Sequence, residues 1–323
     1  MTFDEFQKEW ENASDAIEVR TSGSTGIPKV IKLSKDFVKE SALRTLNFFG
    51  LGEGCNFHSC VAADYIGGKM MAVRAILANG NFSWEQPSNR PLQGSDKTVK
   101  IDLLAVVSSQ MPFILDNLET LPEIKNIIVG GGVIPQQIRD RIAGSGLNVY
   151  ETYGMTETAS HIAMRRVSVE ELPFSTLGDI TVSLDSRGCL AIQFPSGESV
   201  MTNDLAKVLS PKEFEILGRY DNMIITGGVK VNPQEVEKIL SPFIDSPYII
   251  TAFKDDKWGE KIVLVIEGKE EACLKEKVIE TCRERLTPCQ MPKEIIFYPS
   301  LPRTANGKLI RTKSREDYSS VAP

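Results

Sequence analysis

The chain has 323 residues, of which 41% are hydrophobic and 25% charged, and its formal net charge is −6 at pH 7. This length allows one large and one small domain, and the composition is ordinary for a globular protein. The acidic balance and the lack of a basic run exclude nucleic acid and anionic membranes as expected partners. The six cysteines have no CxxC spacing, so we expect scattered reduced thiols.

The N-terminal segment MTFDEFQKEWENASD is acidic and lacks the apolar core of a secretion signal. The longest apolar stretches of the sequence are also too short to span a bilayer. We therefore expect a cytoplasmic protein without membrane insertion.

Residues 16–33 predict two strands joined by a loop of glycine, serine and threonine that ends at Lys29. The backbone N–H groups of such a loop can approach phosphate oxygens, while its hydroxyls add donors and its lysine adds charge. The loop does not match the Walker pattern, because Lys29 enters a strand rather than a helix. Taken alone, such a segment is more often a plain surface turn. Ser34 then predicts the cap of a helix.

Residues 101–155 alternate between two kinds of pattern. Apolar strands are predicted at 101–107, 127–129 and 147–150, with helices near 109–119 and 135–143. This alternation is typical of a parallel-rich α/β core. Three glycines, 130–132, follow one strand directly, which is where α/β proteins usually bind ligands.

A second unit is predicted from Asp221 onward. A strand reaches the Gly227-Gly228 turn, and Asn232 with Pro233 predicts a capped helix. Strands at 247–253, 261–267 and 294–298 and a helix near 270–286 complete an α+β domain of about a hundred residues. We expect domain boundaries at 1–220 and 221–323.

Groups able to do phosphate chemistry follow the strand at 147–150. Thr156 offers a hydroxyl to a phosphate or carboxylate, and Glu157 offers an oxygen ligand to Mg²⁺. The alternative is that these residues only begin a helix, because threonine and glutamate are common at helix N-termini. Further along, Asp204 is able to bind a ribose diol and Arg219 lies near it in sequence, although isolated charges are more often solvated.

Four segments occur in one order: TSGSTGIPK, YGMTET, LGRYDNMIITGGVKVNPQEVE and PRTANGK. Together they resemble the adenylate-forming (AMP-binding) superfamily, in its acyl-CoA synthetase branch, over residues 21–311. The resemblance implies an α/β protein, with a large α/β N-terminal domain and a small mobile α+β C-terminal lid domain. It also implies an AMP-forming acid–thiol ligase that uses ATP, Mg²⁺ and CoA and activates a small-molecule carboxylic acid.

The resemblance also implies a role for each matching residue. Thr156 would contact the α-phosphate, Glu157 the metal, and Lys308 the substrate carboxylate and α-phosphate, which makes these three the expected catalytic residues. Asp221 would be the hinge of the lid. The expected ATP-binding residues are Thr21, Ser22, Gly23, Ser24, Thr25, Gly26, Lys29, Gly131, Gly132, Tyr153, Asp204 and Arg219. The expected CoA-binding residues are Gly227, Gly228 and Lys230.

The chain departs from the family pattern in three places. Only 20 residues precede the phosphate loop, so the N-terminal domain is expected to be shortened. The usual TGD is here Thr202-Asn203-Asp204, which keeps the carboxylate, and Asn222 replaces an acid often found after the hinge. The first departure bears on the shape of the acyl pocket.

The size of the chain and the segments YIGGKMM and YGMTETASH most resemble compact bacterial o-succinylbenzoate–CoA ligases of menaquinone biosynthesis. An aryl dicarboxylate needs an apolar wall and a cationic or hydrogen-bonding anchor. His161 is the expected substrate residue, and His58, Lys69 and Arg74 are further candidates, although each of these residue types more often serves packing or lies on the surface.

Two other interpretations stay open. The first is an adenylating enzyme for another fatty or aryl acid, or for a carrier-protein thiol. The second is a non-catalytic nucleotide-binding protein. The presence of Lys29, Glu157, Asp204, Arg219 and Lys308 together argues against loss of activity.

Overall fold

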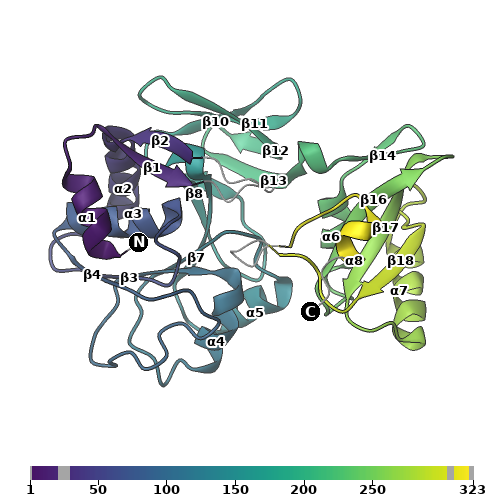
Figure 1. Cartoon of the computed structure of the whole chain (residues 1–323), viewed down its shortest axis with the longest axis horizontal. Helices are drawn as coiled ribbons and strands as arrows, with labels where there is room; N and C mark the ends of the chain where they lie inside the picture. The colour runs from purple at the N-terminus through teal and green to yellow at the C-terminus, as the bar shows by residue number, and fades with distance from the viewer. Residues whose placement is uncertain (1, 21–29, 304–308, 320–323) are drawn as a thin grey trace. The chain divides into compact units, whose positions relative to one another are not determined.

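The computed structural model describes residues 2–20, 30–303 and 309–319 (Figure 1). The chain forms two compact units. The first comprises residues 1–182, 192–200 and 209–214, and the second comprises 183–191, 201–208 and 215–323. The domain boundary expected between residues 220 and 221 was placed at the proposed pivot of the lid. It stays a prediction.

The N-terminal unit begins with helix α1 (Phe3–Glu11) and the antiparallel strands β1 (Ala16–Arg20) and β2 (Val30–Ser34). Helix α2 (Lys35–Phe49) follows, and the Ser34 hydroxyl caps it by accepting the N–H of Phe37 at 3.2 Å. The strand pair and the capped helix expected from the sequence are confirmed.

Five strands of this unit run parallel to one another, and helical segments connect them. The strands are β3 (Asn56–Ser59), β4 (Asn81–Trp84), β5 (Leu103–Val107), β6 (Ile127–Gly130) and β7 (Val149–Met155). The helical segments are α3 (Ile66–Ala78), η1 (Ser108–Gln110), α4 (Met111–Asp116) and α5 (Gln136–Gly144). The parallel-rich α/β core is therefore confirmed.

Antiparallel strands continue the same sheet. β8 (Ser160–Arg166) returns along β7 after the short turn η2 (Thr156–Thr158), and β9 (Phe174–Thr176) pairs with β8. The remaining strands are β10 (Thr181–Leu184), β11 (Cys189–Gln193), β12 (Ser199–Ser210) and β13 (Glu213–Arg219). The order across the sheet is β10-β11-β12-β13-β9-β8-β7-β6-β5-β3-β4.

Helices cover both faces of the parallel strands. Side chains of a strand alternate between faces, and in β5 Leu104 and Val106 belong to one apolar cluster with residues of α4 and α5. Leu103 and Ala105 belong to another cluster, which contains residues of α2 and α3. This burial on both faces explains why the strands read as continuous apolar runs.

The second unit contains a five-stranded sheet, in the order β15-β14-β17-β16 with β18 parallel to β17. Alternate residues of its central strands pack against α6 and α7 on one face and near Tyr318 on the other. Figure 1 shows α6 and α7 beside this sheet. The elements are η3 (Tyr220–Asn222), β14 (Ile224–Thr226), β15 (Val229–Val231), α6 (Pro233–Leu240), β16 (Tyr248–Asp255), β17 (Gly259–Glu267), α7 (Ala272–Arg285), β18 (Glu294–Tyr298) and α8 (Arg315–Ser319).

The α+β character expected for the C-terminal part is confirmed. In the part of the chain that the structure describes, no helix is long and apolar enough to cross a membrane. The described cysteines Cys55, Cys60, Cys189, Cys282 and Cys289 are free thiols.

Candidate functional site

The segment YGMTET forms the end of β7 and the turn into β8, rather than a loop after a shorter strand. Tyr153 lies at a bulge where the register with β8 shifts. A Cβ atom on Gly154 would lie 2.2 Å from the carbonyl oxygen of Ser160, so only glycine fits here. The sequence placed the end of the strand at Tyr150 because Glu151 and Gly154, which follow it, are weak strand formers. Pairing with β8 overrides them.

The turn after Met155 is strained and tightly held. Ala159 and Ser160 have φ values of 50° and 79°, which residues other than glycine rarely adopt. The Thr158 hydroxyl accepts the N–H of Met155 at 2.9 Å, and the buried Ser41 hydroxyl donates to the carbonyl of Ala159 at 2.7 Å. Strain of this kind persists only where the surroundings enforce it, and it is common at functional sites.

This turn presents Thr156 half-buried and Glu157 exposed to solvent. Among the described residues, Glu157 forms no ion pair or hydrogen bond with another side chain, so its oxygens are available to an external partner. A free carboxylate on a fixed turn is a suitable ligand for Mg²⁺, which usually takes one or two protein carboxylates together with phosphate oxygens. The alternative of a helix N-terminus holds in part, because Thr156 and Glu157 begin the 3-10 turn η2, but this turn is only three residues long and lies between two strands.

Gly131 and Gly132 follow β6, the parallel neighbour of β7. The register pairs Val129 with Glu151, so these glycines continue the edge of the sheet from which Tyr153 also extends. Gly131 has a φ of 86°, and a Cβ on Gly132 would meet no atom within 4 Å. The first glycine is required by the backbone conformation, while the second leaves open space.

His161 is buried, and its Nε2 lies 2.8 Å from the hydroxyl of Thr45 on α2. Burial, and then the positive charge of Arg74, hold the pKa of His161 well below 6.5. The expected substrate residue is therefore a neutral imidazole inside the protein. Thr45 was missed by sequence reasoning, because nothing in a helical pattern marks one threonine as the partner of a residue 116 positions later.

Arg74 on α3 is the most unusual side chain near this site. It is fully buried, and burial lowers its pKa to about 9. Its Nη1 has one weak contact, with the Met71 sulfur at 3.6 Å. Among the residues that the structure describes, its Nε and Nη2 have no hydrogen-bond partner. A buried charge is costly unless it is paired, so an anion or polar ligand at this guanidinium would be favourable.

The other candidate anchor from the same helix is already engaged. Lys69 is buried, and its ammonium group donates to Glu9 at 2.8 Å and to the carbonyl of Glu18 at 2.9 Å. It fastens α3 to the N-terminal segment and is thus a packing residue.

In the second unit, Arg219 joins two carboxylates. Its Nη1 lies 3.1 Å from Asp204, while its Nε and Nη2 hold both oxygens of Asp221 at 3.0 and 2.8 Å. Burial acts to raise the pKa of Asp221, but the hydrogen bonds and charge of Arg219 outweigh burial and lower it. The structure thus brings together the expected ribose residue, its assisting arginine and the expected hinge residue.

Arg187, which sequence reasoning missed, supports this cluster from the neighbouring loop. Its Nη1 and Nη2 donate to the side chain of Asn203 and the carbonyl of Thr202, both at 2.8 Å. Its guanidinium also lies 5.5 Å from the ring centre of Tyr220. Asn203, which replaces the usual glycine, is therefore held in place by an arginine. The one signal in the sequence for this contact was the presence of Asn203 where the family usually has glycine.

The Gly227-Gly228 turn connects β14 and β15, and both glycines have positive φ values of 56° and 81°. Gly227 is close to Trp258, whose carbonyl accepts its N–H at 2.9 Å. Lys230 is exposed on β15. These features place three expected CoA-binding residues on one hairpin whose lysine is open to solvent.

Several expected site residues lie outside the described residues, and the structure does not place them. They are Thr21, Ser22, Gly23, Ser24, Thr25, Gly26, Lys29 and Lys308. Their roles stay predictions from the sequence.

Residues 7–185 match the model of the AMP-binding enzyme family, and residues 248–308 match that of the AMP-binding enzyme C-terminal domain. The chain belongs to the AMP-binding enzyme family. A 2-succinylbenzoate–CoA ligase of Bacillus cytotoxicus is 26% identical over 350 aligned residues, which cover 96% of this chain and 72% of that protein. A ligase of the same name from Bacillus cereus is 24% identical, with 92% and 69% covered.

Solved structures show the same fold. An acyl-CoA synthetase (AMP-forming)/AMP-acid ligase II-like protein from Dyadobacter fermentans is 29% identical, with a TM-score of 0.62 and 98% and 92% of the two chains covered. The o-succinylbenzoate coenzyme A synthetase of Bacillus subtilis, in complex with ATP and magnesium ion, is 22% identical, with a TM-score of 0.78 and 91% and 68% covered.

Membership of this family confirms the adenylate-forming superfamily and the mixed α/β fold that the motifs implied. The relatives also support the expected enzyme class, an AMP-forming acid–CoA ligase.

Proposed function

We propose that the protein is an ATP-dependent acid–CoA ligase that activates o-succinylbenzoate, an aromatic acid with a second carboxylate. The observation that carries the choice of acid is the buried guanidinium of Arg74, whose Nε and Nη2 lack partners among the described residues. A ligand carboxylate would supply the missing hydrogen bonds and the missing negative charge. The names of the curated relatives support the same acid.

The energetics favour a dicarboxylate over a fatty acid. A charge-assisted hydrogen bond to a buried cation contributes roughly 1.5–3 kcal/mol. A fatty acid gains about 0.8 kcal/mol for each buried methylene and would leave the cation unpaired. Arg74 and His161 are buried polar side chains of the first unit, and such an interior suits an acid with a second carboxylate.

The reaction takes place in two steps. In the first, a carboxylate oxygen of the acid attacks the α-phosphorus of ATP, the bond to the β-phosphate breaks, and pyrophosphate leaves. In the second, the CoA thiol loses its proton and attacks the acyl carbon, and AMP leaves. The first step builds charge around the α-phosphate, which is where the Thr156 hydroxyl and the Lys308 ammonium group are proposed to act. Mg²⁺ bound through Glu157 would neutralise phosphate charge.

The nucleotide's ribose is proposed to bind Asp204, which is already oriented by Arg219 at 3.1 Å. Tyr153, Gly131 and Gly132, at the carboxyl edge of the parallel strands, are proposed to line the adenine and acyl pocket. The loop from Thr21 to Lys29 is proposed to hold the β- and γ-phosphates. Thioester formation is proposed to follow rotation about Asp221, which brings the hairpin of Gly227, Gly228 and Lys230 to CoA. We also propose that the enzyme acts in the cytoplasm and does not bind nucleic acid.

Acid-dependent exchange of pyrophosphate into ATP tests this proposal. We expect o-succinylbenzoate to support faster exchange than acetate, palmitate or benzoate. Benzoylpropionate is the sharpest control, because it keeps the aryl ketone and the reacting chain but lacks the second carboxylate. Poor exchange with this analogue and restored exchange with the full acid would support the role of Arg74.

Other outcomes separate the remaining interpretations. Faster exchange with palmitate would replace the proposed acid but keep the chemistry. Formation of thioester only on a carrier protein would replace CoA. ATP binding without exchange for any acid would indicate a non-catalytic nucleotide-binding protein.

A further inference from the structure

A second cluster of chemically active side chains lies at the ends of β3 and β4. His58 is on β3, Cys60 follows it two positions later, and Glu85 comes directly after β4. Residues two apart on a strand point to the same face. The parallel register pairs His58 with Ser83, which brings Glu85 opposite Cys60. The sequence offered His58 as a further candidate anchor for the acid, but the structure engages it here with Ser83 and Glu85, and the proposed ligase reaction uses none of the three cluster residues.

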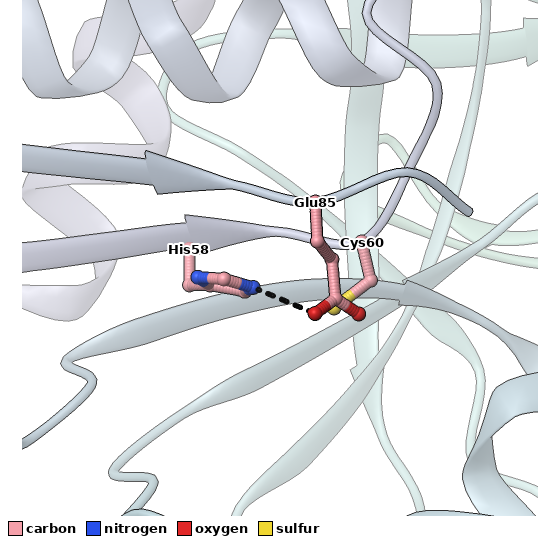
Figure 2. A group of neighbouring side chains, drawn as sticks. All are labelled: His58, Cys60 and Glu85. Atoms are coloured by element: carbon pink, nitrogen blue, oxygen red, sulfur yellow. Dashed lines mark ion pairs between the residues drawn. The ribbon is translucent and has the colours of Figure 1, made fainter. Parts of the chain in front are cut away.

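One nitrogen of His58, the sulfur of Cys60 and one oxygen of Glu85 all lie within 4.8 Å of one another. Figure 2 shows the imidazole ring pointing toward the carboxylate, with the sulfur beside it. Cys60 is fully buried, and only 8% of His58 is exposed. Nε2 of His58 lies 3.7 Å from Glu85 and has no hydrogen-bond partner among the described residues. A buried ring nitrogen is thus aimed at a carboxylate too distant to satisfy it.

The surroundings hold each of the three groups in its orientation. Nδ1 of His58 lies 2.7 Å from the hydroxyl of Ser83, which leaves Nε2 directed at the cluster. Both oxygens of Glu85 accept the N–H of Leu92, at 3.0 and 3.1 Å, and Leu92 has a φ of 61°. A hydrogen bond on the far nitrogen of a histidine is the usual outer contact of a metal-binding imidazole.

The backbone next to the cluster is also held by Gln110 of η1. The buried amide of Gln110 donates to the carbonyl of Cys60 at 3.2 Å and to that of Ser88 at 2.9 Å. The cluster therefore has a fixed backbone on both sides, so binding an ion would require little rearrangement.

We propose that His58, Cys60 and Glu85 form a binding site for a divalent metal ion of the zinc class. Nε2, a thiolate and a carboxylate oxygen would be the three protein ligands, with the fourth tetrahedral position left to water or a small ligand. The mixed N, S and O set suits Zn²⁺ better than Mg²⁺ or Ca²⁺, which prefer oxygen alone. The thiol proton leaves to solvent on binding, and the two negative ligands then balance the charge of the ion.

The metal would fasten the end of β3 to the segment after β4. This role is independent of the ligase reaction, because it requires neither ATP nor an acid.

Direct metal binding tests the proposal. Full-length protein freed of metal by a chelator is titrated with Co²⁺, whose bonds to thiolates give a charge-transfer absorption, and then with Zn²⁺ against a coloured competitor. We expect one Co²⁺ per chain with the thiolate absorption, displaced by Zn²⁺, and a rise in the thermal midpoint on binding. Cys60→Ser should lose the absorption, and Cys289→Ser, at an exposed thiol, should keep it.

Ser83→Ala gives a graded test that spares all three ligands. Loss of the outer contact to the histidine should weaken Zn²⁺ binding about 10–100-fold while binding of ATP stays unchanged. If Cys60→Ser does not fold, X-ray absorption of the wild-type protein loaded with Zn²⁺ replaces it, with one sulfur among the ligands as the expected result. A wild-type chain that shows no thiolate absorption, or one whose absorption disappears in Cys289→Ser, would overturn the proposal.

Discussion

Arg219 holds the carboxylate of Asp221 with two of its nitrogens, at 3.0 and 2.8 Å, and contacts Asp204 with the third at 3.1 Å. The residue expected to bind ribose and the residue expected to pivot the lid therefore share one cation. Because a bidentate pair fixes geometry more firmly than a single contact, the position of Asp221 depends on the side chain that also orients Asp204. A change at either carboxylate should be felt by the other.

Asp221→Pro should separate the two half-reactions. Proline fixes φ near −65° and stiffens the backbone at the proposed pivot. Pyrophosphate exchange should continue, while transfer of the acyl group from preformed acyl-adenylate to CoA should fall. Asp221→Asn is the matched control, because it weakens the pair with Arg219 but leaves the backbone free. Normal rates of both half-reactions in the proline variant would place the hinge elsewhere.

Lys308→Ala should have the opposite effect. The PRTANGK segment predicts that this lysine acts only while the adenylate forms, so pyrophosphate exchange should fall about 10²–10³-fold. Conversion of preformed acyl-adenylate to thioester should stay within a few-fold of the wild-type rate. Equal loss in both assays, in a protein with a normal circular dichroism spectrum, would argue against a lid with two positions.

Arg74→Met should stabilise the free protein while it weakens use of the dicarboxylate. Burial of the guanidinium without partners costs free energy, as its pKa of about 9 indicates. Methionine fills similar space without charge, so the free energy of unfolding should rise by roughly 1–4 kcal/mol, as when other buried charges are replaced by apolar residues. Denaturant unfolding measures this change.

The same variant should raise KM for o-succinylbenzoate far more than KM for ATP. Arg74→Lys is the control, since it keeps the charge but not the planar donors. If Arg74→Met loses stability and also keeps its preference for the dicarboxylate over benzoylpropionate, the guanidinium is a structural residue.

His161 should make the stability of the protein depend on pH. Its pKa is held well below 6.5 in the folded chain, so the unfolded chain takes up the proton first as the pH falls. The contribution is fully present above about pH 6.5 and decreases below it, by at most about 1.4 kcal/mol per pH unit, until the folded pKa is reached. His161→Gln should remove this difference between neutral and acidic pH, as urea unfolding at several pH values would reveal. An unchanged slope would assign it to other groups.

Elements with strong local patterns were predictable. The cap at Ser34, the glycine turn at 227–228 and the apolar strands depend on neighbours within a few residues. The cap and the turn form where the sequence indicated, and the strands predicted at 101–107 and 127–129 form at 103–107 and 127–130. The strand that extends through Tyr153 to Met155 was not predictable, because its partner β8 decides it. The candidate site follows the same division. Thr156, Glu157, Asp204 and Arg219 were found from motifs, whereas Thr45 and Arg187 were not.

The sequence alone determined the family, part of the order of the elements and the residues expected to handle ATP, because these depend on short motifs and local periodicity, whereas α1, α3 and the strands β3, β4 and β8–β13 were not predicted. The tertiary structure decided which side chains have partners. From the sequence, Lys69 and Arg74 were equal candidates for a cationic anchor. In the structure, Lys69 is paired with Glu9 at 2.8 Å, whereas Arg74 is buried with two nitrogens unpartnered among the described residues. Likewise, His58, Cys60 and Glu85 meet only because β3 and β4 run side by side. Hydrogen bonds and burial depend on atoms that long-range packing brings together, and a single sequence does not encode those distances locally.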